Sequence, residues 1–200
     1  MTKQPHYYSE KQSAPMRLRR ISAVLRGREL ELETAGGTFS PKKIDSGSRI
    51  LIESAEIRPG WRVLDLGCGY GPVGLAVAKD CPECEIVMTD VNRRAFQLAK
   101  RNVELNSTAN ATVVRGDMYE NVRGSFNTIL LNPPVNAGRK LCFEMIEKAK
   151  GHLDKGGLLQ LVARHQKGGK MLEKKMEEVF GNVRQAAKKG GFRVYVSEKR

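Results

Sequence analysis

The chain has 200 residues, which is enough for one domain with a sizeable core, and its 40% hydrophobic and 28% charged residues are ordinary for a globular protein. No apolar run is long enough to span a bilayer or to act as a signal peptide, so we expect a cytoplasmic protein. The formal net charge of +13 is unusual. It favours a polyanionic partner such as nucleic acid, although a solubilising or thermophilic lysine-rich surface is the alternative.

The N-terminal part is predicted to carry an extension ahead of a catalytic core. Residues 1–16 are polar, contain two prolines and are expected to form a flexible tail. Alternating residues on both sides of Arg26-Gly27-Arg28 predict a β-hairpin within 17–38. The core is expected over 39–200 and begins with a loop, followed by a helix that Asp45 or Ser46 caps and that runs to about Glu56.

Strands and helices then alternate in the predicted core. Strands are expected at 62–66, 85–89, 111–115, 126–131 and 157–163, and helices at 72–79, 93–105, 140–153 and 168–180. The end differs, because strands at 183–188 and 192–197 are joined by Gly190-Gly191 with no helix between them, which makes them antiparallel neighbours. This order predicts an α/β fold with a Rossmann-like, doubly wound and mostly parallel sheet.

A glycine-rich turn follows the first strand of the predicted sheet. Glycines at Gly67, Gly69 and Gly71 would let a ligand approach the backbone where a helix begins. The same spacing also fits a dinucleotide-binding site. Asp65 just ahead of the turn would repel a pyrophosphate, but it suits the ammonium group of S-adenosylmethionine (SAM), directly or through water.

Two further carboxylates end the next strands. Asp90 is expected to accept hydrogen bonds from ribose hydroxyls, with a helix N-cap as the alternative. Asp117 is expected to accept from the adenine amine, with a turn cap as the alternative. Val91 and Met118 are the candidates to pack on the faces of the adenine ring.

The Asn132-Pro133-Pro134 segment after the fourth strand is the most informative motif. Two prolines keep the chain from continuing as a strand and are expected to leave carbonyls free. The side-chain oxygen of Asn132 and the carbonyl of Pro133 could each accept one N–H of a planar amine and aim its lone pair at an electrophile. A simple strand-terminating turn is the alternative. Beside a SAM site, the corner predicts methylation of an exocyclic amine by proximity and charge stabilisation, without a metal or a covalent nucleophile.

The motifs together resemble the class I small-domain SAM methyltransferases, in particular ribosomal RNA guanine-N2 methyltransferases of the RsmC type in a short, single-domain archaeal form. The matching segments are Thr38-Phe39-Ser40, 45–48, 65–71, 90–95, Asn132-Pro133-Pro134 and Gly138. The resemblance implies a seven-stranded sheet with a reversed last strand, SAM as cofactor and ribosomal RNA as partner. It also implies that the segment with Ser46 and Ser48 borders the cofactor site.

One residue departs from the family pattern. Many relatives carry an aromatic residue after the two prolines, whereas Val135 can pack on a base but cannot stack, so Phe39 or Tyr70 would have to grip it. The target base is expected to be unpaired or extruded, because the guanine amine is engaged inside a helix. The candidates for phosphate contacts are Arg17, Arg19, Arg20, Arg26 and Arg28, with Lys42 and Lys43. A solvated hairpin edge is the alternative for this basic segment.

The leading hypothesis is therefore a SAM-dependent N-methyltransferase that acts on guanine N2 of ribosomal RNA. RNA adenine N6 and protein glutamine present a similar NH2 group and remain alternatives. An NAD(P)-binding oxidoreductase would leave Asp65 and Asn132 unexplained, and a non-catalytic RNA-binding protein would not need the intact motifs. The oligomeric state stays open.

Overall fold

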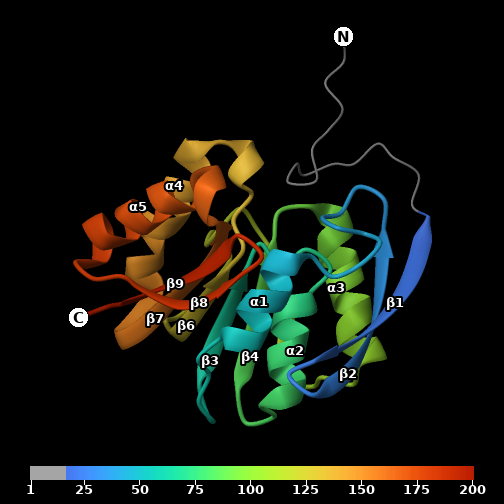
Figure 1. The fold of residues 1–200 in the computed structure, drawn as a ribbon. Coiled ribbons are helices and arrows are strands. Elements are labelled where there is room, and N and C mark those ends of the chain that lie inside the picture. Colours follow the sequence, from blue (N-terminus) through green and yellow to red (C-terminus); the bar gives the residue numbers. More distant parts are fainter. Residues whose placement is uncertain (1–16) are drawn as a thin grey trace.

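The computed structural model describes residues 17–200, so the predicted tail lies outside the described residues. A two-stranded sheet, β1 (Leu18–Leu25) and β2 (Arg28–Ala35), lies beside a seven-stranded sheet in the order β5-β4-β3-β6-β7-β9-β8 (Figure 1). The strands of the large sheet are β3 (Arg62–Leu66), β4 (Glu85–Asp90), β5 (Ala111–Arg115), β6 (Phe126–Leu131), β7 (Leu153–Arg164), β8 (Arg184–Lys189) and β9 (Phe192–Glu198). The helices are α1 (Ser46–Ser54), α2 (Pro72–Asp80), α3 (Arg93–Leu105), α4 (Arg139–Ala149) and α5 (Lys170–Phe180).

The topology of the large sheet is the predicted one. Strands β3 to β7 pair in parallel, β9 runs antiparallel to β7, and β8 runs antiparallel to β9. The expected class I methyltransferase architecture with a reversed last strand and an N-terminal hairpin is thereby confirmed. The start of β9 consequently lies at the same edge of the sheet as the carboxyl ends of the parallel strands.

Helices cover both faces of the large sheet. One apolar cluster joins α1, α2 and α3 to the sheet and the N-terminal hairpin, and the other joins α4 and α5 to the opposite face (Figure 1). Successive side chains of β6 alternate between the two, since Leu130 belongs to the first cluster and Ile129 and Leu131 to the second. Strands buried on both faces read as continuous apolar runs, which explains why they could be recognised in the sequence. Among residues 17–200, no helix has the length and apolar character needed to cross a membrane.

Two predicted boundaries in the C-terminal half are wrong. Strand β7 begins at Leu153, which was predicted to end a helix, instead of at Gly157, because Gly156 (φ 77°) lies in an irregularity inside the strand. Helix α5 begins at Lys170 and not at Gly168, whose φ of 98° is incompatible with a helix. A kinked, non-helical turn (His165–Gly169) therefore separates β7 from α5.

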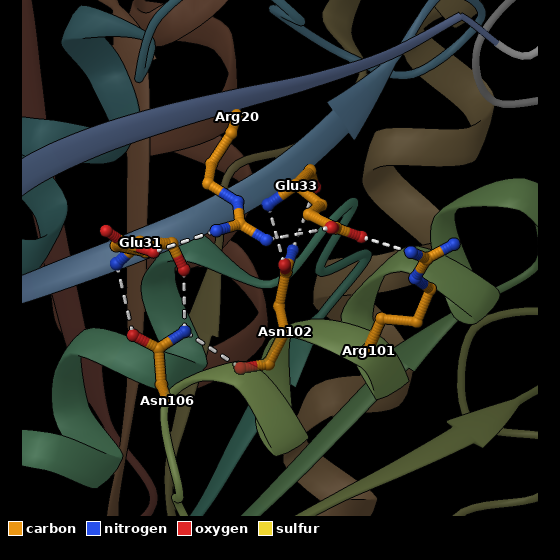
Figure 2. Close-up of polar contacts among 6 residues, drawn as sticks. All are labelled: Arg20, Glu31, Glu33, Arg101, Asn102 and Asn106. Atoms are coloured by element: carbon orange, nitrogen blue, oxygen red, sulfur yellow. Dashed lines mark hydrogen bonds and ion pairs between the residues drawn. The ribbon is translucent and has the colours of Figure 1, made fainter.

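The N-terminal hairpin is fastened to α3 by two asparagine side chains (Figure 2). Asn102 accepts from the backbone N–H of Glu33 at 2.7 Å and donates to its carbonyl at 2.9 Å, and Asn106 pairs with the backbone of Glu31 in the same way. The two side-chain amides thus pair with the backbone of β2 along the edge of the strand that does not face β1. Asn102 also donates to the Tyr70 carbonyl at 2.8 Å, which connects the hairpin to the glycine-rich turn.

Candidate active site

A cavity of about 460 Å³ opens at the carboxyl edge of the large sheet, and its size is within the range of about 300–1,000 Å³ that is usual for small-molecule sites. The predicted site residues that line it are Phe39, Ser48, Asp65, Gly67, Gly69, Tyr70, Asp90, Val91, Asp117, Met118, Asn132, Pro133, Pro134 and Val135. The fold therefore brings together the motifs of five successive segments in one place.

Some predicted residues do not line the cavity. Ser46 is exposed in the first turn of α1, and Gly71 instead caps α2 with a φ of 92°, where an added Cβ would lie 3.1 Å from Leu75. Gly71 is thus needed for the backbone and for packing, not for ligand contact. The predicted phosphate-binding residues Arg17, Arg19, Arg20, Arg26, Arg28, Lys42 and Lys43 also lie outside the lining.

The glycine-rich turn has the backbone that a close ligand approach requires. Gly67 and Gly69 have φ angles of 73° and 60°, which other residues rarely adopt. A Cβ at either position would meet nothing within 4 Å, so both glycines face open space. A bound molecule can therefore approach the peptide groups of this turn.

Asp65 is buried at the end of β3, with 3% of its surface exposed. Its Oδ2 accepts from the backbone N–H of Gly74 at 2.8 Å. Burial raises the pKa of Asp65 to about 7, and that hydrogen bond only partly opposes the increase. No ion pair to Asp65 exists among residues 17–200, so a cationic ligand would supply a missing counter-charge.

Asp90 shapes the turn from the next strand. Its two oxygens accept from the backbone N–H groups of Gly69 and Asn92, each at 2.8 Å, while burial raises its pKa to about 6. The N-cap of α3 is Asn92, whose side chain accepts from Arg94 and Ala95, so the alternative reading of Asp90 as that cap is excluded. Each carboxylate oxygen keeps a second lone pair, which can accept from a ribose hydroxyl.

The loop after β5 borders the same cavity. Asp117 is exposed there, and its carbonyl accepts from Glu120 in a turn. Met118 has a φ of 49°, a left-handed conformation that is uncommon for a residue with a side chain. The strained backbone and the lining position agree with a binding role of this loop.

The amide of Asn132 has a fixed orientation. Its Nδ2 donates to Asp45 Oδ2 at 3.2 Å and to Ser48 Oγ at 3.0 Å. Asp45 is itself held because it caps α1 through the N–H of Ser48 at 2.9 Å. With its nitrogen engaged by two acceptors, the amide presents its oxygen as the remaining hydrogen-bonding group.

The expectation of free proline carbonyls is wrong. The Pro133 carbonyl accepts from Val135 N at 2.9 Å, and the Pro134 carbonyl accepts from Ala137 N at 2.7 Å. Pro134, with φ −76° and ψ 73°, is the centre of an inverse γ-turn, which the sequence did not suggest. A carbonyl oxygen has two lone pairs, so Pro133 retains one for a substrate amine.

Sequence reasoning missed part of the lining. The cavity is also lined by Arg164 at the end of β7, Lys167 in the kinked turn after it, and Phe192 at the start of β9. A Cβ at Gly47 would lie 2.9 Å from the Phe192 ring, so this glycine allows α1 to approach β9 closely. Phe192 could have been predicted from the antiparallel terminal hairpin. Because β9 runs against the parallel strands, its first residue lies at the sheet edge where the cavity opens.

The buried donors and acceptors fit SAM better than a dinucleotide. Asp65, which is buried, and Asp90, which is half-buried, have no cationic partner among residues 17–200, so they suit a ligand that carries a sulfonium and an ammonium group. The open glycine turn accommodates its amino-acid part. A pyrophosphate would instead meet the negative charge of Asp65.

Comparison with known proteins identifies the family. Residues 29–196 match the family model of the methyltransferase small domain. The chain belongs to this family. The expected class, a SAM-dependent methyltransferase, is therefore confirmed at the level of the family.

Individual relatives of this methyltransferase fall into two groups by length. The uncharacterized protein YbxB of Bacillus subtilis (strain 168) is 38% identical over 199 residues, which cover 97% of this chain and 98% of that protein. The ribosomal RNA small subunit methyltransferase C of Hamiltonella defensa is 36% identical, with 84% of this chain and 50% of that protein covered. The chain thus spans about half the length of the rRNA methyltransferases that it matches. The archaeal assignment is not borne out, since YbxB, a relative of matching length, is bacterial.

A solved structure agrees with these relatives. The T. thermophilus 16S rRNA N2 methyltransferase RsmC, in complex with AdoMet and guanosine, superposes with a TM-score of 0.81 at 27% sequence identity. The match covers 95% of this chain and 53% of that protein. The fold is thus that of a methyltransferase domain of known architecture.

Proposed function

We propose that the protein transfers the methyl group of SAM to guanine N2 in ribosomal RNA, and that it does so in the cytoplasm. The observation that carries the proposal is the orientation of Asn132. Asp45 and Ser48 hold its nitrogen, so its oxygen is available to accept an N–H from the substrate amine. The named relatives and the RsmC structure, which was solved with AdoMet and guanosine, support the same chemistry.

The proposed cofactor contacts follow the strand order. Asp65 would bind the ammonium group, Gly67 and Gly69 would admit the amino-acid part, and Asp90 would bind the ribose. Asp117 would accept from the adenine amine, with Val91 and Met118 on the ring faces. Ser48 acts through Asn132 in this arrangement, while Ser46 and Gly71 contribute to the backbone around the site.

SAM, when bound, supplies an electrophilic methyl group. The chain supplies position: the Asn132 oxygen and the second lone pair of the Pro133 carbonyl each accept one N–H of the amine. Both acceptors favour the positive charge that grows on the attacking nitrogen. The product nitrogen is acidic and loses its proton to solvent, so the proposal needs no basic side chain at this point.

The target base would lie between apolar side chains. Phe39 lines the cavity with 36% of its surface exposed, whereas Tyr70 is only 2% exposed and has its hydroxyl 3.4 Å from the Ser40 carbonyl. We therefore assign stacking to Phe39 and packing to Val135. A base can reach this position only when it is unpaired or extruded.

A labelling experiment tests the proposal. Methyl-labelled SAM is incubated with the protein and either total RNA or total protein, and the RNA is then hydrolysed to nucleosides. We expect label in N2-methylguanosine. Label in N6-methyladenosine would overturn the base assignment, and label in protein alone would favour the glutamine alternative.

The substrate should also be offered in assembled form. Because the chain spans about half the length of the rRNA methyltransferases that it matches, free RNA and isolated small ribosomal subunits are tested side by side. Transfer to neither RNA, subunits nor protein, despite measurable SAM binding, would contradict the proposed reaction.

A further inference from the structure

The carboxyl edge of the large sheet is divided by charge. Following the sheet order, the lining residues at the strand ends are Asp117 after β5, Asp90 in β4 and Asp65 in β3. Asn132 follows β6 and is neutral. Arg164 then ends β7, and Phe192 begins β9. The three carboxylates thus lie on one side of Asn132 and the basic residues on the other.

The basic side continues across the terminal hairpin. Arg164 is in register with Phe192, and Phe192 is in register with Lys189 of β8. Lys188 is in register with Arg193 in the adjacent row, whose side chains point to the opposite face of the sheet, so Lys188 and Lys189 flank this strand end from its two faces. Directly opposed residues in antiparallel strands point to the same face, so Arg164, Phe192 and Lys189 form one row that spans roughly 10 Å, or two strand spacings.

Within residues 17–200, no carboxylate neutralises these cations, Arg164, Lys167, Lys188 and Lys189, through an ion pair. The Arg164 guanidinium lies over the Phe192 ring, 4.6 Å from its centroid, which holds the charge at the rim of the cavity. All four side chains belong to exposed residues.

The turn that carries Lys167 is fixed against the catalytic segment. A Cβ on Gly168 would lie 3.0 Å from Val135 Cγ1, so the backbone of the turn rests on the residue after the two prolines. His165 Nδ1 lies 2.8 Å from the Tyr195 hydroxyl, and His165 N donates to Gly191 O at 2.9 Å. These contacts tie the turn to β9 and place its charge beside the target position.

The N-terminal hairpin contrasts with this region. Arg20 pairs with Glu31 and Glu33 of the neighbouring strand, and Arg26 pairs with Asp80 while donating to the carbonyls of Ile52 and Ala55. The positive charge of these two arginines is therefore partly used within the fold, away from the cavity lining.

We propose that the edge formed by Arg164, Lys167, Lys188 and Lys189 is the track for the RNA backbone that flanks the target nucleotide. The inference rests on the proposed function and deepens it by naming the phosphate contacts. Phosphates next to an extruded base require cations near the mouth of the site, and single-stranded RNA binds by such contacts together with stacking. The acidic side would be unsuitable, because its carboxylates repel phosphates.

Matched double variants test the track. Lys188→Ala/Lys189→Ala removes two charges that lie outside the cavity, and Arg19→Ala/Arg28→Ala removes two exposed charges of the N-terminal hairpin. Binding of a guanine-containing oligoribonucleotide is measured across a salt series, together with SAM affinity and thermal stability. Transfer to ribosomal RNA is measured in parallel.

For the lysine variant we expect RNA binding to weaken by about five- to tenfold and the salt slope to fall by about 1.4, since each phosphate contact on a single strand contributes about 0.7. SAM affinity should not change. The hairpin variant should bind RNA as the unchanged protein does. Lys188→Arg/Lys189→Arg keeps the charge and should restore binding, which separates a charge effect from a folding effect.

The possible failures are distinguishable. If the unchanged protein methylates RNA and the lysine variant binds RNA normally, the track is wrong and the proposed function stands. If only the hairpin variant loses RNA binding, the phosphate contacts belong to Arg19 and Arg28 instead. If transfer occurs only to protein, with RNA binding unaffected by either variant, both the track and the RNA substrate are overturned.

Discussion

The two sides of the carboxyl edge differ in both charge and burial. On the β5-β4-β3 side, Asp65 is buried and Asp90 is half-buried, and desolvation raises their pKa values to about 7 and about 6. On the β7-β9-β8 side, Arg164 and Lys189 belong to exposed residues. Buried carboxylates cost free energy until a cation binds, whereas exposed cations remain solvated and attract a polyanion.

The difference indicates how one cavity can hold two ligands of opposite charge. A small cationic ligand fits the buried acidic side, where its contacts are strong because water is excluded. A large anionic ligand fits the exposed basic side, where it can leave after each reaction. Asn132 lies between them, directly after β6, at the point where the two ligands would meet.

The largest expected effect on kcat concerns Asn132, which lies at the boundary between the two sides. Asn132→Ala removes the oriented acceptor, and we expect kcat to fall by about 10²–10³-fold, as for the loss of a hydrogen bond made to a developing charge. SAM and RNA affinities should stay within about twofold of their original values, because the ligands on either side keep their contacts. Single-turnover kinetics and calorimetry check this. Full activity of the variant would remove Asn132 from the mechanism.

The acidic side is tested by pH. A cationic ligand requires ionised Asp65, whose pKa is raised to about 7 by burial, so SAM affinity should fall by about tenfold per pH unit below 7. Calorimetry in buffers of different ionisation enthalpy should show proton release on binding below that pH. Asp65→Asn should bind weakly at all pH values and lose the dependence.

The same carboxylate affects the stability of the ligand-free protein. Its folded pKa lies above the ordinary value of 3.8, so its stabilising contribution is present below about pH 4 and is lost as the pH rises towards 7. Asp65→Asn should flatten this decline in a thermal-melting series. A steeper decline in the variant would contradict the assigned cause.

Substitutions of two asparagines test how the acidic side of the cavity is attached to the N-terminal hairpin. Asn102→Ala should lower the free energy of unfolding by about 1–3 kcal/mol through unpaired buried groups and should weaken SAM binding, because Asn102 also holds the Tyr70 carbonyl. Asn106→Ala is the matched control and should affect stability alone. Equal SAM affinity of the two variants would show that the hairpin and the turn are uncoupled.

The smallest expected effect concerns Ser48. Ser48→Ala removes one of two acceptors for the Asn132 amide, so we expect a roughly threefold lower kcat, within the modest range of a single hydrogen bond, and unchanged SAM affinity. A drop in SAM affinity with kcat preserved would instead indicate direct cofactor contact.

Much of the fold could be predicted because its signals are local. Strands β3, β4, β6 and β7 are largely buried and appear as apolar runs, and glycines, prolines and asparagines mark the strand ends. The predicted ranges of β3, β5, β6 and α3 coincide with the observed ones. The errors lie at Gly156 and Gly168, where a glycine interrupts an element or separates two elements, and the sequence pattern alone does not distinguish these cases.

The sequence by itself determined the acidic side and the Asn132 corner, because each residue lies at or just after the end of a recognisable strand of a parallel sheet, and such strand ends must meet at one edge. Only the tertiary structure decided which residues form the basic side. The reversal of β9 brings Phe192 and Lys189 into register with Arg164, although the chain separates them by more than twenty residues. Tertiary contacts also decided that Arg20 and Arg26 find carboxylates, and that the Pro133 carbonyl closes a turn. Net charge states how many cations a chain carries, but packing sets which of them remain available to a partner.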